Sequence, residues 1–114
     1  MPRNIVESVQ GTLDFLILKT LSWGDMHGYA IARWIFDRSG EELSIEEGTL
    51  YPALHRLEER GWIEAEWGLS ENKRRAKFYR LTPVGRAELM KRIAEWSRFT
   101  GAVERVLRAV PEGA

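Results

Sequence analysis

The chain has 114 residues, 44% of them apolar, which is enough for one domain with a hydrophobic core and too few for two independent domains. It contains no cysteine, which excludes disulfides, thiolate metal ligands and cysteine nucleophiles. Its formal net charge is zero, so any attraction to an acidic partner must come from the placement of its basic residues. The first residues lack a signal-peptide pattern and the densest apolar run is interrupted by Asp14 and Lys19, so a cytoplasmic protein without a membrane partner is expected.

Two helices are expected at the start of the chain. Residues 9–22 carry apolar side chains at helical spacing on more than one side, which predicts a helix that is covered on two faces. Residues 23–25 read as a turn, and residues 27–39 have the pattern of a second helix, which Gly40 ends.

A third helix is predicted to end at about Arg60, with Gly61 as its stop. Leu50, Leu54 and Leu57 recur at helical spacing and define one buried face. Ser44 and Glu47 have the spacing of a capping box, which indicates a start near Ser44. Pro52 removes one hydrogen bond inside this helix, so either its first turn is irregular or it starts after Ser44.

A β-hairpin follows the third helix. Residues 62–67 alternate with period two, which places Ile63, Ala65 and Trp67 on one face and two glutamates on the other. Residues 77–81 fit a second strand, with residues 68–75 as the tip between them. Three helices followed by a hairpin is the order of a winged helix-turn-helix, so the expected fold is mainly α with a small β-hairpin wing, over residues 1–81.

A fourth helix is predicted from Thr82, whose hydroxyl can cap it, through Pro83 to about Val110. Such a helix is roughly 40 Å long, longer than the diameter of about 30 Å of a domain of this size, so part of it must project. Its four-three spacing is that of a coiled-coil seam, which predicts a homodimer and makes residues 82–114 a dimerisation helix and tail in one structural unit with the wing domain. The seam residues are Leu89, Ile93, Trp96, Thr100, Val103, Leu107 and Val110.

Basic residues concentrate between Asn72 and Arg80, where there is no acidic residue. They are Lys73, Arg74, Arg75, Lys77 and Arg80. A hairpin with this charge suits contact with the phosphates of double-stranded DNA, because a winged helix lays this segment along the DNA backbone. The alternative is a solvated surface loop.

The third helix carries the other candidate DNA contacts, because the second helix of a helix-turn-helix unit enters the major groove. Its candidates are Thr49, Tyr51, Pro52, His55 and Arg56, among which Arg56 is best able to make a bidentate contact with a base. The alternative is an ordinary exposed helix face.

Three motifs of the chain resemble the PadR family of bacterial transcriptional regulators, and the resemblance extends over about residues 9–110. The single short C-terminal helix resembles the family's smaller subgroup. The motifs are Glu46-Glu47-Gly48-Thr49-Leu50-Tyr51-Pro52-Ala53-Leu54-His55-Arg56-Leu57-Glu58, Gly61-Trp62-Ile63 and Lys77-Phe78-Tyr79-Arg80-Leu81-Thr82-Pro83-Val84-Gly85.

The resemblance implies a dimeric repressor that binds a near-palindromic operator, with recognition by the third helix and backbone contact by the wing. Some members of the smaller subgroup bind flat aromatic compounds between paired tryptophans at the dimer interface. Trp96 lies in the matching part of the fourth helix, so it is the candidate contact for a small planar aromatic effector. The alternative is that Trp96 packs in the dimer seam without a ligand.

The sequence offers little for catalysis. It has no recognisable nucleophile–base pair, phosphate loop or carboxylate dyad, and its two histidines are far apart, so neither enzyme activity nor a metal or cofactor is expected. The competing function is a winged-helix dimer that serves as a protein-interaction or ligand-binding module without DNA binding. The zero net charge favours this alternative, whereas the basic wing argues against it.

Overall fold

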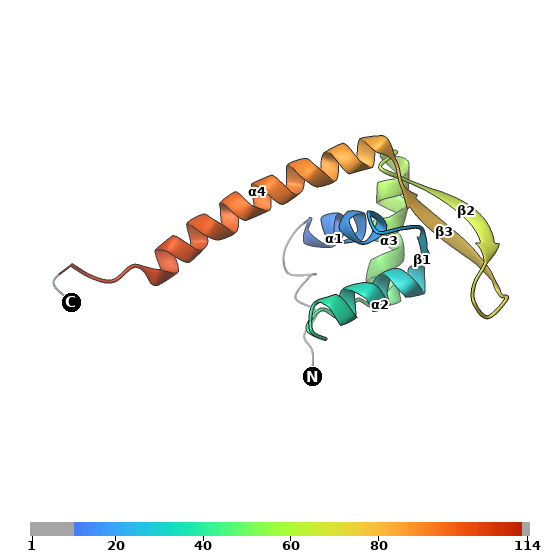
Figure 1. The fold of residues 1–114 in the computed structure, drawn as a ribbon, viewed down its shortest axis with the longest axis horizontal. Helices are drawn as coiled ribbons and strands as arrows, with labels where there is room; N and C mark the ends of the chain where they lie inside the picture. The colour runs from blue at the N-terminus through green and yellow to red at the C-terminus, as the bar shows by residue number, and fades with distance from the viewer. Residues whose placement is uncertain (1–10, 113–114) are drawn as a thin grey trace.

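The computed structural model describes residues 11–112 as four helices and a small sheet (Figure 1). The predicted fold class, a winged helix with an added C-terminal helix, is confirmed. The first residues of the helix expected over 9–22 lie outside the described residues. The elements in chain order are α1 (Thr12–Leu21), β1 (Met26–His27), α2 (Gly28–Arg38), α3 (Glu47–Glu59), β2 (Ile63–Leu69), β3 (Arg75–Leu81) and α4 (Pro83–Arg108).

The sheet is antiparallel with the order β1-β3-β2. The two-residue strand β1, which the sequence did not predict, pairs His27 with Phe78 and so ties the start of α2 to the wing. Both wing strands are longer than predicted, because their pairing continues to Leu69 and Arg75. Trp67 is therefore 57% exposed rather than half-buried, since the hairpin extends beyond the core at this point.

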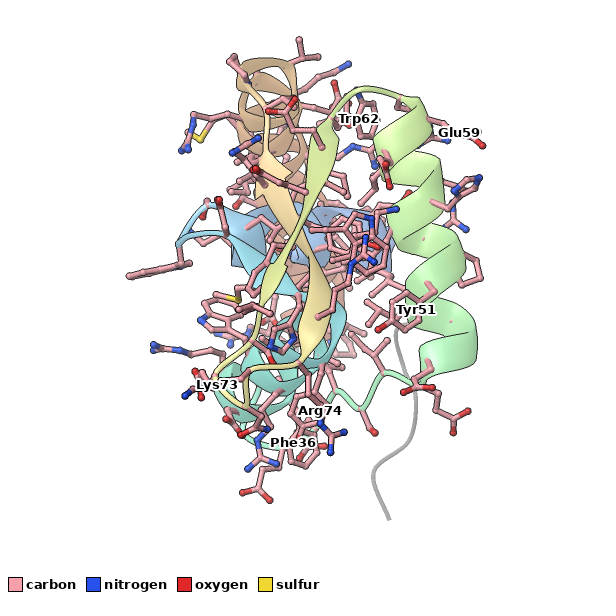
Figure 2. All side chains as sticks on the ribbon, turned by 90° about the vertical axis from the view of Figure 1, so that its right-hand side faces the viewer. Phe36, Tyr51, Glu59, Trp62, Lys73 and Arg74 are labelled. Atoms are coloured by element: carbon pink, nitrogen blue, oxygen red, sulfur yellow. The ribbon has the colours of Figure 1, made fainter. Side chains whose placement is uncertain are left out.

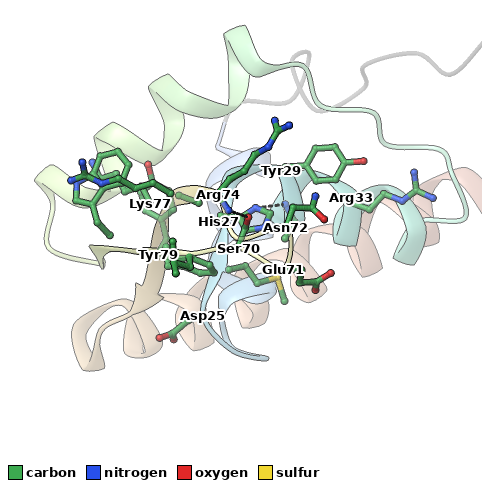
Figure 3. Close-up of a pocket in the computed structure, with 18 of the residues that line it drawn as sticks. Asp25, His27, Tyr29, Arg33, Ser70, Glu71, Asn72, Arg74, Lys77 and Tyr79 are labelled. Atoms are coloured by element: carbon green, nitrogen blue, oxygen red, sulfur yellow. Dashed lines mark hydrogen bonds between the residues drawn. The ribbon is translucent and has the colours of Figure 1, made fainter.

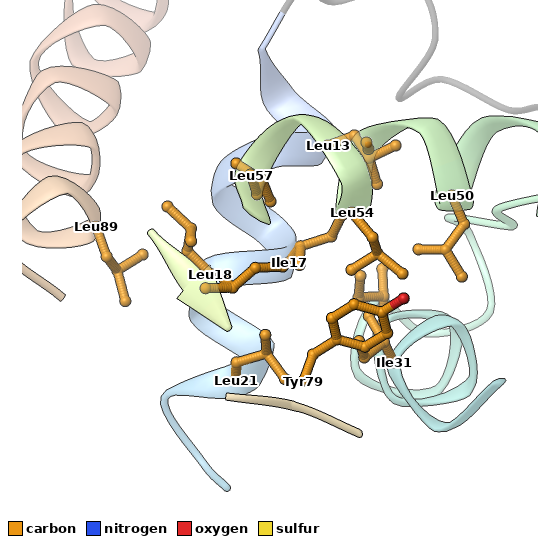
Figure 4. Close-up of a cluster of buried hydrophobic side chains, with 13 residues drawn as sticks. Leu13, Ile17, Leu18, Leu21, Ile31, Leu50, Leu54, Leu57, Tyr79 and Leu89 are labelled. Atoms are coloured by element: carbon orange, nitrogen blue, oxygen red, sulfur yellow. The ribbon is translucent and has the colours of Figure 1, made fainter. Parts of the chain in front are cut away.

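The core forms around α1, which packs against α2, α3, α4 and β3. Ile17 and Leu18 on this helix have no exposed surface, which confirms that α1 is covered on more than one side (Figure 4). The predicted apolar face of α3 is buried as expected, with Leu50, Leu54 and Leu57 at most 2% exposed. Each fully buried leucine contributes roughly 1.5–3 kcal/mol to the free energy of unfolding, so these three fix which side of α3 faces solvent.

The start of α3 differs from the predicted capping box. The helix begins at Glu47 after an extended Glu46, and no side chain caps it. Leu43 and Ile45 on the preceding segment pack against the core instead. The extended segment that this packing requires is incompatible with a helical turn at Ser44, and α3 therefore starts later than the spacing with Glu47 suggested.

The start of α4 is fixed on the turn between α3 and β2. The Gly85 N–H donates to the Thr82 hydroxyl oxygen at 3.0 Å, which confirms the predicted cap. A Cβ atom at Gly85 would lie 1.9 Å from the carbonyl oxygen of Trp62, so only glycine permits this approach. From this anchor the 26 residues of α4 run past α1 and project beyond the domain, as predicted (Figure 1).

The first part of α4 belongs to the domain's own core. Leu89 is 3% exposed inside this core and Ile93 packs against it. The prediction that Leu89 serves dimerisation is therefore wrong, because a four-three apolar spacing looks the same whether a helix covers its own core or a partner. Farther along α4, Val103 is 38% and Leu107 75% exposed. None of the helices in residues 11–112 is long and apolar enough to cross a lipid bilayer.

Candidate nucleic-acid interface

The exposed face of α3 is a narrow stripe opposite its leucine face. Gly48, Pro52, His55 and Glu59 follow one another at four-three-four spacing and are all exposed. The His55 Nε2 atom lies 2.8 Å from the Glu59 carboxylate, and the stripe contains no lysine or arginine. The stripe can therefore offer an imidazole, a carboxylate and an apolar proline ring to the base edges of a groove.

Arg56 lies at the edge of this stripe and is bound to α1. Its Nη2 atom donates to the Asp14 carboxylate at 3.0 Å, and the Asp14 side chain is only 9% exposed. The Arg56 side chain is half exposed, as its helix position predicted. Its guanidinium, however, is engaged within the chain rather than available for the bidentate base contact expected from the sequence, because a buried carboxylate needs a cationic partner.

Tyr51 lies on the other edge of the stripe and packs against the start of α2. A Cβ atom at Gly28 would lie 2.5 Å from the Tyr51 hydroxyl oxygen, so α2 and α3 approach each other here only because residue 28 is glycine. Tyr51 is 45% exposed and Tyr29, on α2, is 71% exposed. Sequence reasoning found Tyr51 but missed Tyr29, whose exposure depends on how α2 meets α3.

The wing has two faces of different charge. Cross-strand partners share a face, so Arg75 and Lys77 lie on the same side as Leu69 and Trp67. This side meets α3, because the Lys77 Nζ atom lies 3.3 Å from the Glu58 carboxylate. We call it the inner face of the wing.

The outer face of the wing has more carboxylates than basic groups. Arg80 lies 3.0 Å from Glu64, 3.8 Å from Glu66 and 3.9 Å from Asp25. Arg80 therefore adds little positive potential, although it belonged to the basic cluster in the sequence.

The tip of the wing carries the remaining positive charge. Lys73 and Arg74 are exposed, and within residues 11–112 no carboxylate forms an ion pair with them or with Arg75. Two backbone hydrogen bonds fix the turn, from the Ser70 N–H to the Arg74 carbonyl at 2.8 Å and from the Lys73 N–H to the Ser70 carbonyl at 2.9 Å. The Arg75 guanidinium stacks over the Trp67 ring at 4.5 Å. The cationic groups are therefore held on a defined turn.

An open groove of about 1260 Å³ runs between the wing and the start of α2 (Figure 3). Its lining includes His27, Tyr29 and Tyr51 from the helical side and Arg74 from the wing. Burial raises the pKa of the Tyr79 phenol in this groove above its ordinary value of 10.0, although Lys77 lowers it. Tyr79 therefore adds no negative charge at neutral pH. Figure 2 looks onto this side of the molecule and shows Tyr51 on α3 beside the wing that bears Lys73 and Arg74.

A separate aromatic cluster lies where α4 passes α1. The Trp96 ring lies 5.5 Å from the Phe15 ring and 6.1 Å from the Phe99 ring. Trp96 is 37% and Phe99 61% exposed, and the rings border a shallow hollow of about 270 Å³. The sequence pointed to Trp96 alone. Phe15 and Phe99 emerge only from the way α1 and α4 cross.

Comparison with known proteins agrees with this architecture. Residues 17–91 match the model of the "Transcriptional regulator PadR-like family". A solved transcriptional regulator from Clostridium thermocellum is 34% identical, with a TM-score of 0.78 over 87% of this chain and 96% of that chain. A solved PadR family transcription regulator from Clostridium difficile is 31% identical, with a TM-score of 0.75 over 85% of this chain and 99% of that chain.

A relative with a named role is the negative transcriptional regulator PadR of Bacillus subtilis. It is 31% identical over 77 residues, which make up 68% of this chain and 42% of that protein. The aligned part thus spans less than half of the Bacillus protein. The family match extends from α1 through the wing into α4 and includes the candidate interface. The chain therefore belongs to the PadR-like family of transcriptional regulators.

Proposed function

We propose that this protein binds double-stranded DNA as a homodimer and represses transcription from a near-palindromic operator. The observation that carries the proposal is that the basic wing tip and the edge of the exposed stripe of α3 border one groove, whose lining includes Arg74 and Tyr51. Lys77 joins the inner face of the wing to α3 on the same side. In this arrangement α3 enters the major groove and Lys73, Arg74 and Arg75 contact phosphates. The regulator acts in the cytoplasm, on the cell's own DNA, and needs neither a cofactor nor catalysis.

The wing and α3 have different proposed roles, phosphate contact and base contact, because they differ in charge. Phosphate contacts by the wing tip position the protein without reading sequence. Thr49, Tyr51, Pro52 and His55 then lie where side chains of a recognition helix meet base edges. This division explains how a protein of zero net charge can bind DNA, since Lys73, Arg74 and Arg75 outnumber Glu71, the one carboxylate of the wing-tip turn.

Repression is supported by the Bacillus subtilis relative, whose name describes a negative regulator. In a two-fold symmetric dimer, the two α3 helices meet half-sites about 34 Å apart, one turn of duplex. A near-palindromic operator matches this symmetry.

A second copy of the chain is the proposed occupant of the exposed apolar side of α4. Val103, Val106 and Leu107 form one stripe at coiled-coil spacing and are 38–75% exposed. Val110, predicted as the last seam residue, lies beyond the end of α4 at Arg108, because the chain is already extended at Ala109. A projecting stripe of this kind usually marks an interface, and a partner helix would remove it from water.

We further propose that Trp96, with Phe15 and Phe99, receives a planar aromatic effector where two copies of α4 meet. The supporting observation is the half-open aromatic hollow, in which the rings lie at stacking distances and Trp96 keeps exposed surface. The alternative is that the partner's helix alone covers these rings.

The wing is tested by replacing Lys73, Arg74 and Arg75 together with alanine. Affinity for all duplexes should fall alike, and the slope of log K against log salt should become shallower by about 0.9 for each lost phosphate contact. Fluorescence anisotropy with a labelled random-sequence duplex over a salt series measures both quantities.

Arg74→Ala and Arg80→Ala form a matched pair for this test, because each removes one arginine from the same hairpin. Arg80 is already paired with Glu64, so only Arg74→Ala should change the salt slope. Equal slopes for the triple variant and the unmodified protein would remove the wing from the interface. Failure of the unmodified protein to bind any duplex at low salt would favour the interaction-module alternative.

The dimer is tested by Val103→Asp combined with Leu107→Asp. Two buried charges at the proposed interface are costly, so the variant should have the mass of a monomer in light scattering and should bind an operator far more weakly. Arg105→Gln, on the opposite side of α4, is the control and should leave the mass unchanged. An unmodified protein that is already monomeric at micromolar concentration contradicts the dimer.

The effector site is tested with proflavine, a planar aromatic dye, in the absence of DNA. Quenching of tryptophan fluorescence should report binding, and Trp96→Leu should weaken it by up to roughly tenfold, since an aromatic pair contributes about 0.5–1.5 kcal/mol. Trp23→Phe is the control, because Trp23 contacts Trp34 away from this hollow. Unchanged dye affinity in Trp96→Leu would leave Trp96 as a packing residue.

A further inference from the structure

Asp14 is a buried carboxylate in the middle of the molecule. It lies on α1, is 6% exposed, and faces two arginines from the C-terminal half of α3. Its oxygens lie 3.0 Å from an Arg56 nitrogen and 3.7 Å from an Arg60 nitrogen. A carboxylate removed from water needs such partners, because an unpaired buried charge costs several kcal/mol. Asp14 therefore holds both guanidinium groups against α1.

This pairing determines the charge of the proposed DNA-binding surface. Arg56 and Arg60 are the arginines of α3 and its C-cap, and each side chain is about half exposed, at 50% and 47%. They are therefore close enough to solvent to turn outward if nothing held them. Arg60 has a second restraint, because its guanidinium stacks over the Trp62 ring at 5.0 Å.

We propose that Asp14 is a specificity-determining residue that withholds Arg56 and Arg60 from DNA. The inference rests on the proposed DNA binding. A free arginine beside the recognition stripe would contact phosphates of any sequence, and such contacts raise non-specific affinity. With both arginines held on α1, the stripe from Gly48 to Glu59 meets the groove without them, and sequence-independent attraction is confined to the wing. Asp14 acts through the two arginines and is thus a positioning residue that touches no DNA.

The test replaces Asp14 with leucine, which removes the acceptor and fits an apolar site, and with asparagine, which removes only the charge. Both variants should bind a labelled random-sequence duplex more tightly than the unmodified protein. The salt slope should steepen by about 0.9 for each arginine that gains a phosphate, with the larger change in Asp14→Leu. A role in stability alone would weaken binding or leave it unchanged, so the direction of the effect separates the two.

Two controls accompany these variants. Glu104→Gln makes the same change in net charge and frees Arg108, to which Glu104 is bound at 2.7 Å, but does so near the end of α4. It should leave the slope unchanged. Arg56→Gln with Arg60→Gln in the otherwise unmodified protein should also leave the slope unchanged, and adding Asp14→Asn to this pair should no longer steepen it.

The outcomes are decided by the salt slope. A shallower salt slope in the Arg56→Gln, Arg60→Gln variant overturns the proposal, because the two arginines would then already contact DNA in the unmodified protein. This double variant still decides the question if Asp14→Leu does not fold. Circular dichroism shows whether Asp14→Asn and Asp14→Leu are folded. If both are folded and their salt slopes equal that of the unmodified protein, the role of Asp14 is overturned, although the proposed DNA binding still stands. If the unmodified protein binds no duplex at all, the proposed function fails, and this inference fails with it.

Discussion

The packing of the leucine face of α3 against α1 is the contact on which the other features depend. Leu50, Leu54 and Leu57 have almost no exposed surface, and their burial sets the rotation of α3 about its own axis. The same α1 helix meets α4 through Leu89 on another side. One buried helix, α1, therefore positions both the proposed recognition surface and the proposed dimer helix. A displacement of α3 or α4 would also displace α1.

Several basic side chains around the proposed DNA-binding surface are paired with carboxylates: Arg56 with Asp14, Lys77 with Glu58, and Arg80 with several carboxylates of the outer face. The wing tip departs from this pattern, because Lys73, Arg74 and Arg75 form no ion pair within residues 11–112. A DNA-binding surface of low total charge relies on a few well-placed phosphate contacts, so its affinity depends on salt less steeply than that of a strongly basic protein.

Much of the fold could be predicted because it depends on local signals. The leucine spacing of α3, the hydroxyl cap at Thr82 and the alternation in the hairpin each act within a few residues. The errors concern partners that are distant in sequence. Apolar spacing does not indicate that Leu89 faces its own core. No residue near Arg56 in the sequence predicts its pairing with Asp14, which lies 42 residues away. Likewise, the aromatic partners of Trp96 depend on the crossing of two helices.

In the proposed complex, α3 and the wing together read a DNA sequence. The measurement to make is fluorescence anisotropy of the unmodified protein with the duplex upstream of its own gene and with a scrambled duplex of equal composition, at two salt concentrations. Binding to both duplexes should be salt-sensitive, and binding to the upstream duplex should be tighter at either salt concentration. If neither duplex is bound at low salt, DNA recognition by α3 and the wing is wrong, and α4 becomes the functional surface to examine.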